Sequence, residues 1–106
     1  MSELPPFWKW GSCKSEDESN PDKLVIVLKE LDTFETEYGI NYTGTVNGAD
    51  YAISVYNFNS VNKSLYKKIK GLIASGKIKQ DKPFKVLTWL GISKNDRKIR
   101  KWEVEP

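Results

Sequence analysis

The alternation of hydrophobic and polar positions predicts three β-strands in the first half of the chain. The run LVIVL opens a strand-like segment over residues 24–37, which ends at a Tyr-Gly turn. Residues 40–46, INYTGTV, alternate between apolar and polar side chains, as a half-buried strand does. The Asn-Gly pair that follows readily adopts positive φ, so it predicts a tight hairpin into a third strand over residues 49–58.

The period then changes to that of a helix. Asn59 or Ser60 is placed to cap this helix, and Gly76 is placed to end it in a left-handed conformation. After the helix, residues 84–92 and 99–105 predict a fourth and a fifth strand joined by the turn SKNDRK. The apolar residues that recur every three or four positions along the helix are Val61, Leu65, Ile69, Leu72 and Ile73.

The N-terminal 23 residues have a different composition from the rest of the chain. They consist of an aromatic patch, LPPFWKWG, and a polar acidic run, SCKSEDESNPDK, which cannot bury enough apolar surface to order itself. We therefore expect a flexible tail over residues 1–23 and a single domain over residues 24–106. Because large rings usually pack against protein, we expect Phe7, Trp8 and Trp10 to fold back onto the domain, with docking on a partner or stacking on bases as alternatives.

The predicted order of three strands, one helix and two strands matches a known small fold. On this order, the chain resembles OB-fold single-stranded nucleic-acid-binding domains. The stretch DTFETEYGINYTGTVNGADYAISVYNF and the basic hairpin GISKNDRKIRKW carry the resemblance, which covers residues 24–105. It implies a mainly β fold, a five-stranded Greek-key barrel with one helix between strands 3 and 4. An SH3-like barrel or another α+β roll shares part of this order.

Charge adds a functional direction. The net charge is only +3, yet residues 63–101 hold thirteen Lys or Arg and two acids, while residues 3–22 and 30–50 hold five acids each. Aromatic residues are interleaved with the cations of the basic stretch. Cations neutralise phosphates and flat rings stack on exposed bases, so we expect a single-stranded nucleic-acid ligand, with DNA favoured over RNA.

The OB-fold resemblance implies a ligand groove across strands 2 and 3, bounded by the loops at residues 36–39 and 91–98. The second loop is the richer in cations, although exposed turns are often Lys-rich without binding anything. The candidate nucleic-acid-binding residues are Tyr38, Tyr56, Phe58, Lys85, Trp89, Lys94, Arg97, Lys98, Arg100 and Lys101.

Strand parity indicates which rings face outward. Tyr56 and Phe58 share the face opposite the apolar residues of the third strand, so we expect them to form a stacking platform unless the helix or the tail covers them. Between the two tryptophans near the basic hairpin, we expect Trp89 to be exposed and Trp102 to face the core. Tyr42 alternates in phase with apolar neighbours and is expected to pack inside.

Candidate catalytic and metal chemistry is sparse. The chain has no His and a single Cys, so the usual zinc or haem ligand sets and an internal disulfide are excluded, and a reducing, cytoplasmic setting fits best. Asp32, Glu35 and Glu37 form the best carboxylate cluster, but Asp32 differs from the other two in strand parity. We therefore expect a non-catalytic protein without cofactor or metal. No apolar run is long enough to span a membrane, and no secretion signal is visible.

Alternatives to this function stay open. The chain could be a protein-interaction module that uses its basic face or its FWKW patch, or an RNA-binding OB-like domain. Duplex binding through the helix lysines is disfavoured, because that face lacks the Arg or Gln that reads base edges. The acidic run could also occupy the basic groove when nucleic acid is absent, or serve only as a soluble linker. A replication or repair accessory, or a small protein of a virus, a plasmid or an archaeon, is the setting we expect.

Overall fold

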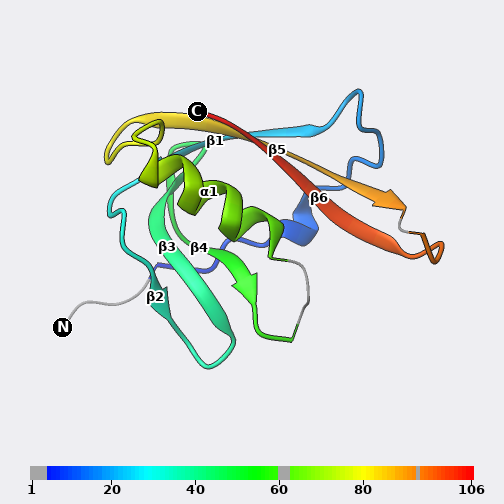
Figure 1. Ribbon diagram of the computed structural model, residues 1–106, viewed down its shortest axis with the longest axis horizontal. Helices are drawn as coiled ribbons and strands as arrows, with labels where there is room; N and C mark the ends of the chain where they lie inside the picture. Colours follow the sequence, from blue (N-terminus) through cyan, green and yellow to red (C-terminus); the bar gives the residue numbers. More distant parts are fainter. Residues whose placement is uncertain (1–4, 60–62, 93) are drawn as a thin grey trace.

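The computed structural model describes residues 5–59, 63–92 and 94–106, and it is mainly β (Figure 1). One α-helix lies between the fourth and fifth strands. The elements are a short 3-10 helix η1 (Trp10–Ser12), the strands β1 (Asp22–Leu28), β2 (Phe34–Glu35), β3 (Gly39–Val46), β4 (Ala49–Asn57), β5 (Pro83–Ile92) and β6 (Lys98–Glu105), and the helix α1 (Ser64–Ala74).

The six strands form one antiparallel sheet. β4 pairs with β3, β3 pairs with both β1 and β2, β1 pairs with β5, and β5 pairs with β6. Across the described residues, β4 and β6 do not pair, so the sheet is not closed. The expected count of five strands is therefore wrong, and the expected closed barrel is not present.

The sixth strand arises because the expected first strand over residues 24–37 is divided in two. β1 ends beside β3 with the pair Leu28 and Gly44, and β2 rejoins the same strand with the pair Phe34 and Asn41. The register differs by three residues between these two pairings, so the polar residues between β1 and β2 leave the ladder. A Cβ on Gly44 would lie 2.2 Å from the Val27 carbonyl oxygen, which shows how closely β1 approaches β3 before the chain leaves the sheet.

The local turn and core predictions for β3 and β4 are confirmed. Asn47 and Gly48 have φ values of 51° and 89°, as a two-residue hairpin requires. Tyr42 is 2% exposed and belongs to the core. The core also contains alternate residues of β1 and β5 such as Ile26 and Val86.

The helix begins later than expected. Its N-cap is Lys63, without a side-chain hydrogen bond, whereas Asn59 lies in a turn where its backbone amide donates to Asn57 Oδ1. The expectation that Asn59 caps the helix is therefore wrong, while the alternative cap Ser60 and the stripe residue Val61 lie outside the described residues. The C-terminal prediction is confirmed, because Gly76 follows the helix with a φ of 77°. Leu65 and Ile69 are buried and face the core, as their spacing predicts.

Residues 5–13 pack along the free edge of β4. Phe7 forms a parallel bridge to Ala52, whose amide donates to the Pro6 carbonyl at 2.9 Å and whose carbonyl accepts from the Trp8 amide at 2.9 Å. Cys13 is buried in the core, against which Trp8 and Trp10 pack from the rim. The folding back of these two rings is thus confirmed, and the packed unit includes residues that the sequence assigned to a tail. Within the described part of the chain, no helix is long and apolar enough to cross a membrane.

Candidate nucleic-acid interface

Three of the predicted aromatic residues meet at one end of the β3–β4 pair, and we call Tyr38, Tyr56 and Phe58 the aromatic cluster. The Phe58 amide donates to the Tyr38 carbonyl at 2.9 Å, and the rings of Tyr56 and Phe58 meet edge to face with centroids 5.6 Å apart. Tyr38 is 65% exposed and Phe58 is 45% exposed, whereas Tyr56 is half-buried. A Cβ on Gly39 would lie 2.0 Å from the Tyr56 carbonyl oxygen, so glycine is required for this close approach. The sheet therefore presents two accessible rings supported by a third.

A lysine at the start of α1 joins this cluster. Lys63 Nζ lies 5.3 Å from the centroid of the Tyr56 ring, and the Lys63 side chain is exposed. Two helical turns later the arrangement repeats, with Lys70 Nζ 5.5 Å from the centroid of the Tyr66 ring. The sequence predicts lysines on the surface of the helix but does not indicate that Lys63 and Lys70 lie against aromatic rings. The spacing of three and four residues between Lys63, Tyr66 and Lys70 places them on one side of a helix, and this spacing could have identified the group from the sequence.

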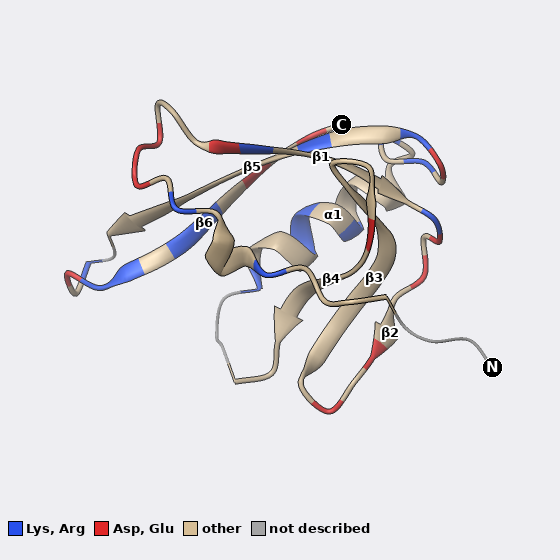
Figure 2. Ribbon diagram, turned by 180° about the vertical axis from the view of Figure 1, so that it is seen from behind, with Lys and Arg blue, Asp and Glu red and all other residues tan. Residues whose placement is uncertain are grey.

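Exposed cations gather on the turn and outer half of the β5–β6 pair, and we call Lys94, Arg97, Lys98 and Lys101 the basic hairpin. Figure 2 shows the cationic residues of β6 along the arm that projects from the body of the protein. Because antiparallel strands joined by a short turn stay side by side, the turn and the first half of β6 bring these four cations together at one end of the β5–β6 pair.

Arg100 has a different place from the other hairpin cations. It is half-buried, and its guanidinium donates to the Cys13 carbonyl at 2.7 Å and to Thr88 Oγ1 at 3.1 Å. Arg100 therefore ties the N-terminal segment to the sheet. We assign it a positioning role rather than direct contact with a phosphate.

Trp89 is 8% exposed, so the expectation of an exposed Trp89 is wrong. The N-terminal segment lies beside it, because the Leu90 amide donates to the Ser15 carbonyl at 2.8 Å. Trp102 is half-buried and meets Trp10 edge to face at 5.8 Å, in agreement with its predicted inward orientation.

Lys85 lies apart from the other candidate residues. On β5 it stands between Val25 of β1 and Glu105 of β6. Seven residues separate it from Ile92 at the hairpin end of β5, which corresponds to about 23 Å of extended strand. The structure therefore does not bring Lys85 to the basic hairpin.

The start of α1 connects the aromatic cluster with the basic hairpin. A cavity of about 580 Å³ is lined by Ser64 and Lys68 of α1, by Trp89, Lys101 and Trp102 of the β5–β6 pair, and by Glu18. Lys68 Nζ donates to the Trp102 carbonyl at 2.7 Å. Lys63, which lies over the aromatic cluster, directly precedes the first helical residue that lines this cavity.

An acidic loop, residues 14–20, lies against the basic hairpin. Glu16 Oε1 is 2.6 Å from Lys98 Nζ, so one hairpin cation is already paired with an N-terminal acid. The loop is held by internal bonds: the Ser15 amide donates to Asp22 Oδ2, and the Ser19 amide and hydroxyl donate to Asp17 Oδ1. These bonds from Ser19 lower the pKa of the Asp17 carboxyl.

Catalytic and metal-binding chemistry has little geometric support in the described part of the chain. No group of three or more His, Cys, Asp or Glu side chains there is arranged to hold a metal ion. Burial raises the pKa of the Cys13 thiol, which keeps this side chain protonated and weakly nucleophilic.

No protein-family model, curated protein or solved structure matches the chain. Its geometry is therefore the basis for assigning a function.

Proposed function

We propose that this protein is a non-catalytic, single-stranded nucleic-acid-binding protein with DNA as the favoured ligand. One observation carries the proposal: Lys63 lies over the ring of Tyr56, which packs against the exposed ring of Phe58, and the helix that Lys63 opens also borders the basic hairpin. Rings for bases and cations for phosphates thus form one surface rather than two. That combination is what sequence-independent strand binding requires.

The binding mode follows from this arrangement. Bases stack on Tyr38 and Phe58, and the sugar-phosphate backbone passes the start of α1 toward Lys98 and Lys101. Little sequence specificity is expected along this path, because every base has a flat face and lysine attracts any phosphate. Each phosphate neutralised adds about −0.7 to the slope of log affinity against log salt.

The strand pairings support an open OB-like fold. β1 and β2 share one edge of β3, so together they correspond to the single first strand of the five-stranded arrangement. The order of paired strands, β4, β3, β1, β5 and β6, then follows the Greek-key order of the five-stranded barrel. The pairing between β4 and β6 that would close the barrel is absent among the described residues. Between β4 and β6, the N-terminal segment lies on the edge of β4. The expected ligand face on β3 and β4 coincides with the aromatic cluster.

A protein-interaction module is the second candidate. Two rings of the FWKW patch pack within the protein itself. Trp10 Nε1 donates to the Ser54 carbonyl at 2.8 Å, and the Trp8 ring packs against the Tyr51 ring with centroids 5.1 Å apart. Phe7 remains 45% exposed, and the basic hairpin would suit an acidic partner. Such a partner does not need the aromatic cluster, which is why we favour nucleic acid. An RNA ligand would use the same rings and cations as DNA. With DNA as the ligand, the role we propose is in replication or repair in the cytoplasm.

The decisive experiment measures binding of a fluorescently labelled oligo(dT) of about 12 nucleotides by anisotropy, a length within the usual range of such sites. Phe58→Ala is expected to weaken binding by about 5- to 100-fold, which corresponds to the loss of about 1–3 kcal/mol of stacking. Phe58 is 45% exposed, so its removal affects folding little. Val25→Ala is the matched control, because Val25 is 44% exposed and lies on β1.

Duplex DNA and single-stranded RNA of equal length complete the test. The proposal predicts weaker binding of the duplex, whose bases are not free to stack. Absence of binding at low salt would refute it, and so would equal effects of Phe58→Ala and Val25→Ala. A strand that stays intact during incubation with Mg²⁺ is expected of a non-catalytic protein, and its cleavage would contradict that part.

A further inference from the structure

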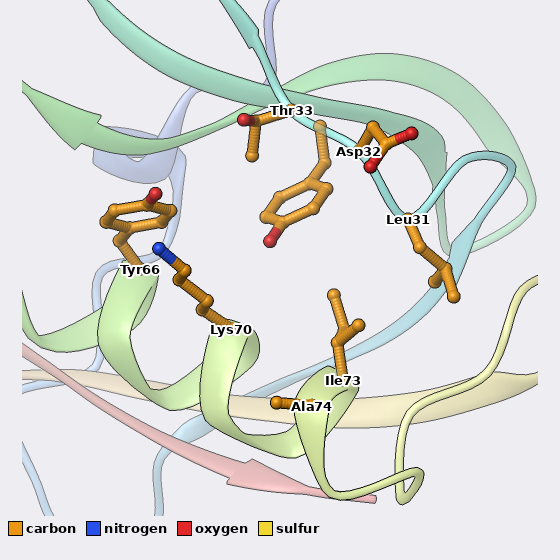
Figure 3. Close-up of a pocket in the computed structure, with 8 residues that line it drawn as sticks. Leu31, Asp32, Thr33, Tyr66, Lys70, Ile73 and Ala74 are labelled. Atoms are coloured by element: carbon orange, nitrogen blue, oxygen red, sulfur yellow. The ribbon is translucent and has the colours of Figure 1, made fainter.

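A pocket of about 330 Å³ lies between α1 and the connection from β1 to β2, and we call it the helix pocket. Figure 3 shows Asp32 and Thr33 on the side of the connection, with Tyr66 and Lys70 on the facing side of the helix. Tyr42 of β3 also lines it. The pocket exists because the chain leaves the sheet between β1 and β2, which places polar side chains opposite the helix. Its volume is at the small end of ligand pockets, suited to one small ring system.

The Tyr42 side chain is the most informative group in the pocket. It is 2% exposed, yet its hydroxyl makes no hydrogen bond with any residue of the described ranges. That hydroxyl is not among the fully buried unpaired side-chain atoms of the described residues, so it opens into the pocket that Tyr42 lines. Burial, helped by nearby Tyr66 and Asp32, raises the pKa of Tyr42 to about 12, so the phenol stays neutral and can donate and accept. The group is therefore suited to a ligand atom inside the pocket.

Two opposite charges line the pocket together with Tyr42 and do not neutralise each other. Among the described residues, Asp32 and Lys70 form no ion pair, and Lys70 is instead held over the ring of Tyr66. The pocket thus offers a carboxylate on one side and an ammonium on the other, with Leu31 adding apolar surface. A ligand that fits is flat and uncharged, with a hydrogen-bond donor at one edge and acceptors beside it.

We infer that the helix pocket holds one base of the bound strand and selects bases with an exocyclic amino group, such as cytosine, over thymine or uracil. The carboxylate of Asp32 accepts from the amino group, and the hydroxyl of Tyr42 and the ammonium of Lys70 face the ring nitrogen and carbonyl. Thymine and uracil would present a carbonyl oxygen to the carboxylate, which is repulsive.

This inference rests on the proposed function and adds one selective position to a surface that otherwise stacks any base. The pocket is within reach of that surface. Lys63 and Lys70 are seven residues apart, which is about 10 Å along the helix.

The test compares oligo(dC) with oligo(dT) of equal length by anisotropy at a pH of about 8, where cytosine is neutral. The native protein is expected to bind oligo(dC) about tenfold more tightly, a difference of about 1.4 kcal/mol. Tyr42→Phe removes only the hydroxyl and is expected to lower this preference to about threefold or less, with oligo(dT) binding unchanged. Tyr51→Phe is the control, because Tyr51 is a half-buried tyrosine of the same sheet that packs on Trp8.

Asp32→Ala provides a second variant that does not threaten folding, because Asp32 is exposed. It is expected to abolish the preference for oligo(dC) while leaving oligo(dT) binding equal or slightly stronger. Equal binding of both oligonucleotides by the native protein would overturn the inference and leave the proposed function intact. A preference that survives both substitutions would overturn it too. If neither oligonucleotide binds, the proposed function fails, and this inference fails with it.

Discussion

Replacing Trp10 by alanine tests whether the N-terminal segment is part of the folded unit. Trp10 Nε1 donates to the Ser54 carbonyl at 2.8 Å, and its ring meets those of Trp8 and Trp102 edge to face at 6.2 and 5.8 Å. A fully buried Trp→Ala substitution costs about 3–5 kcal/mol. Trp10 is half-buried, so we expect about 2 kcal/mol from packing and about 1 kcal/mol from the hydrogen bond. Their sum is a large share of the roughly 5–15 kcal/mol that stabilises a protein of this size.

Urea unfolding followed by circular dichroism measures this loss as a shift of the midpoint at constant slope. Trp10→Phe keeps most of the ring contact and should cost only about 1–1.5 kcal/mol, mainly from the lost hydrogen bond. Lys9→Ala changes an exposed neighbour and should stay within about 0.5 kcal/mol of the native protein. If Trp10→Ala also stays within that margin, the segment does not contribute to stability and the reasoning is refuted.

Two further predictions concern charge and protonation. Glu16→Gln removes the charged partner of Lys98 and should raise the affinity for oligo(dT) a few-fold at low salt, and this gain should fade as the salt concentration rises. Glu105→Gln is the control. If Glu16→Gln has no larger effect than this control, the acidic loop does not compete with nucleic acid. Burial raises the pKa of Tyr42 to about 12 from 10.0, so the folded state holds this proton more tightly than the unfolded state. The resulting stabilisation is complete below pH 10 and is lost as the pH rises toward 12, so urea midpoints should fall more steeply over this window for the native protein than for Tyr42→Phe. Parallel curves would contradict the assignment.

Local sequence signals predicted those features that depend on a few neighbouring residues. The Asn47-Gly48 hairpin, the end of the helix before Gly76 and the burial of Tyr42 all follow from backbone preference or strand alternation. The proximity of Tyr38 and Phe58 was also within reach, because a tight hairpin fixes the register of β3 and β4 back to their far end.

The features that the sequence did not reveal depend on contacts between distant segments. The break after Leu28 occurs where β1 pairs with β3 at Gly44 and the two backbones approach closely, and strand propensity contains no information about where that pairing ends. Trp89 is buried in a part of β5 that also contacts the N-terminal segment, more than seventy positions earlier, through the bond between Leu90 and Ser15. Alternation identifies the face of a strand on which a ring lies, but not what covers that face.

The placement of the N-terminal segment also bears on self-association. An unpaired strand edge is a template for other chains, and here the backbone groups of Ala52 at the edge of β4 are bonded to Pro6 and Trp8 instead. A truncated form without this segment would expose that edge together with the apolar surface beneath Trp8 and Trp10. Dimers or aggregates of such a fragment would therefore reflect an uncovered edge rather than the native assembly.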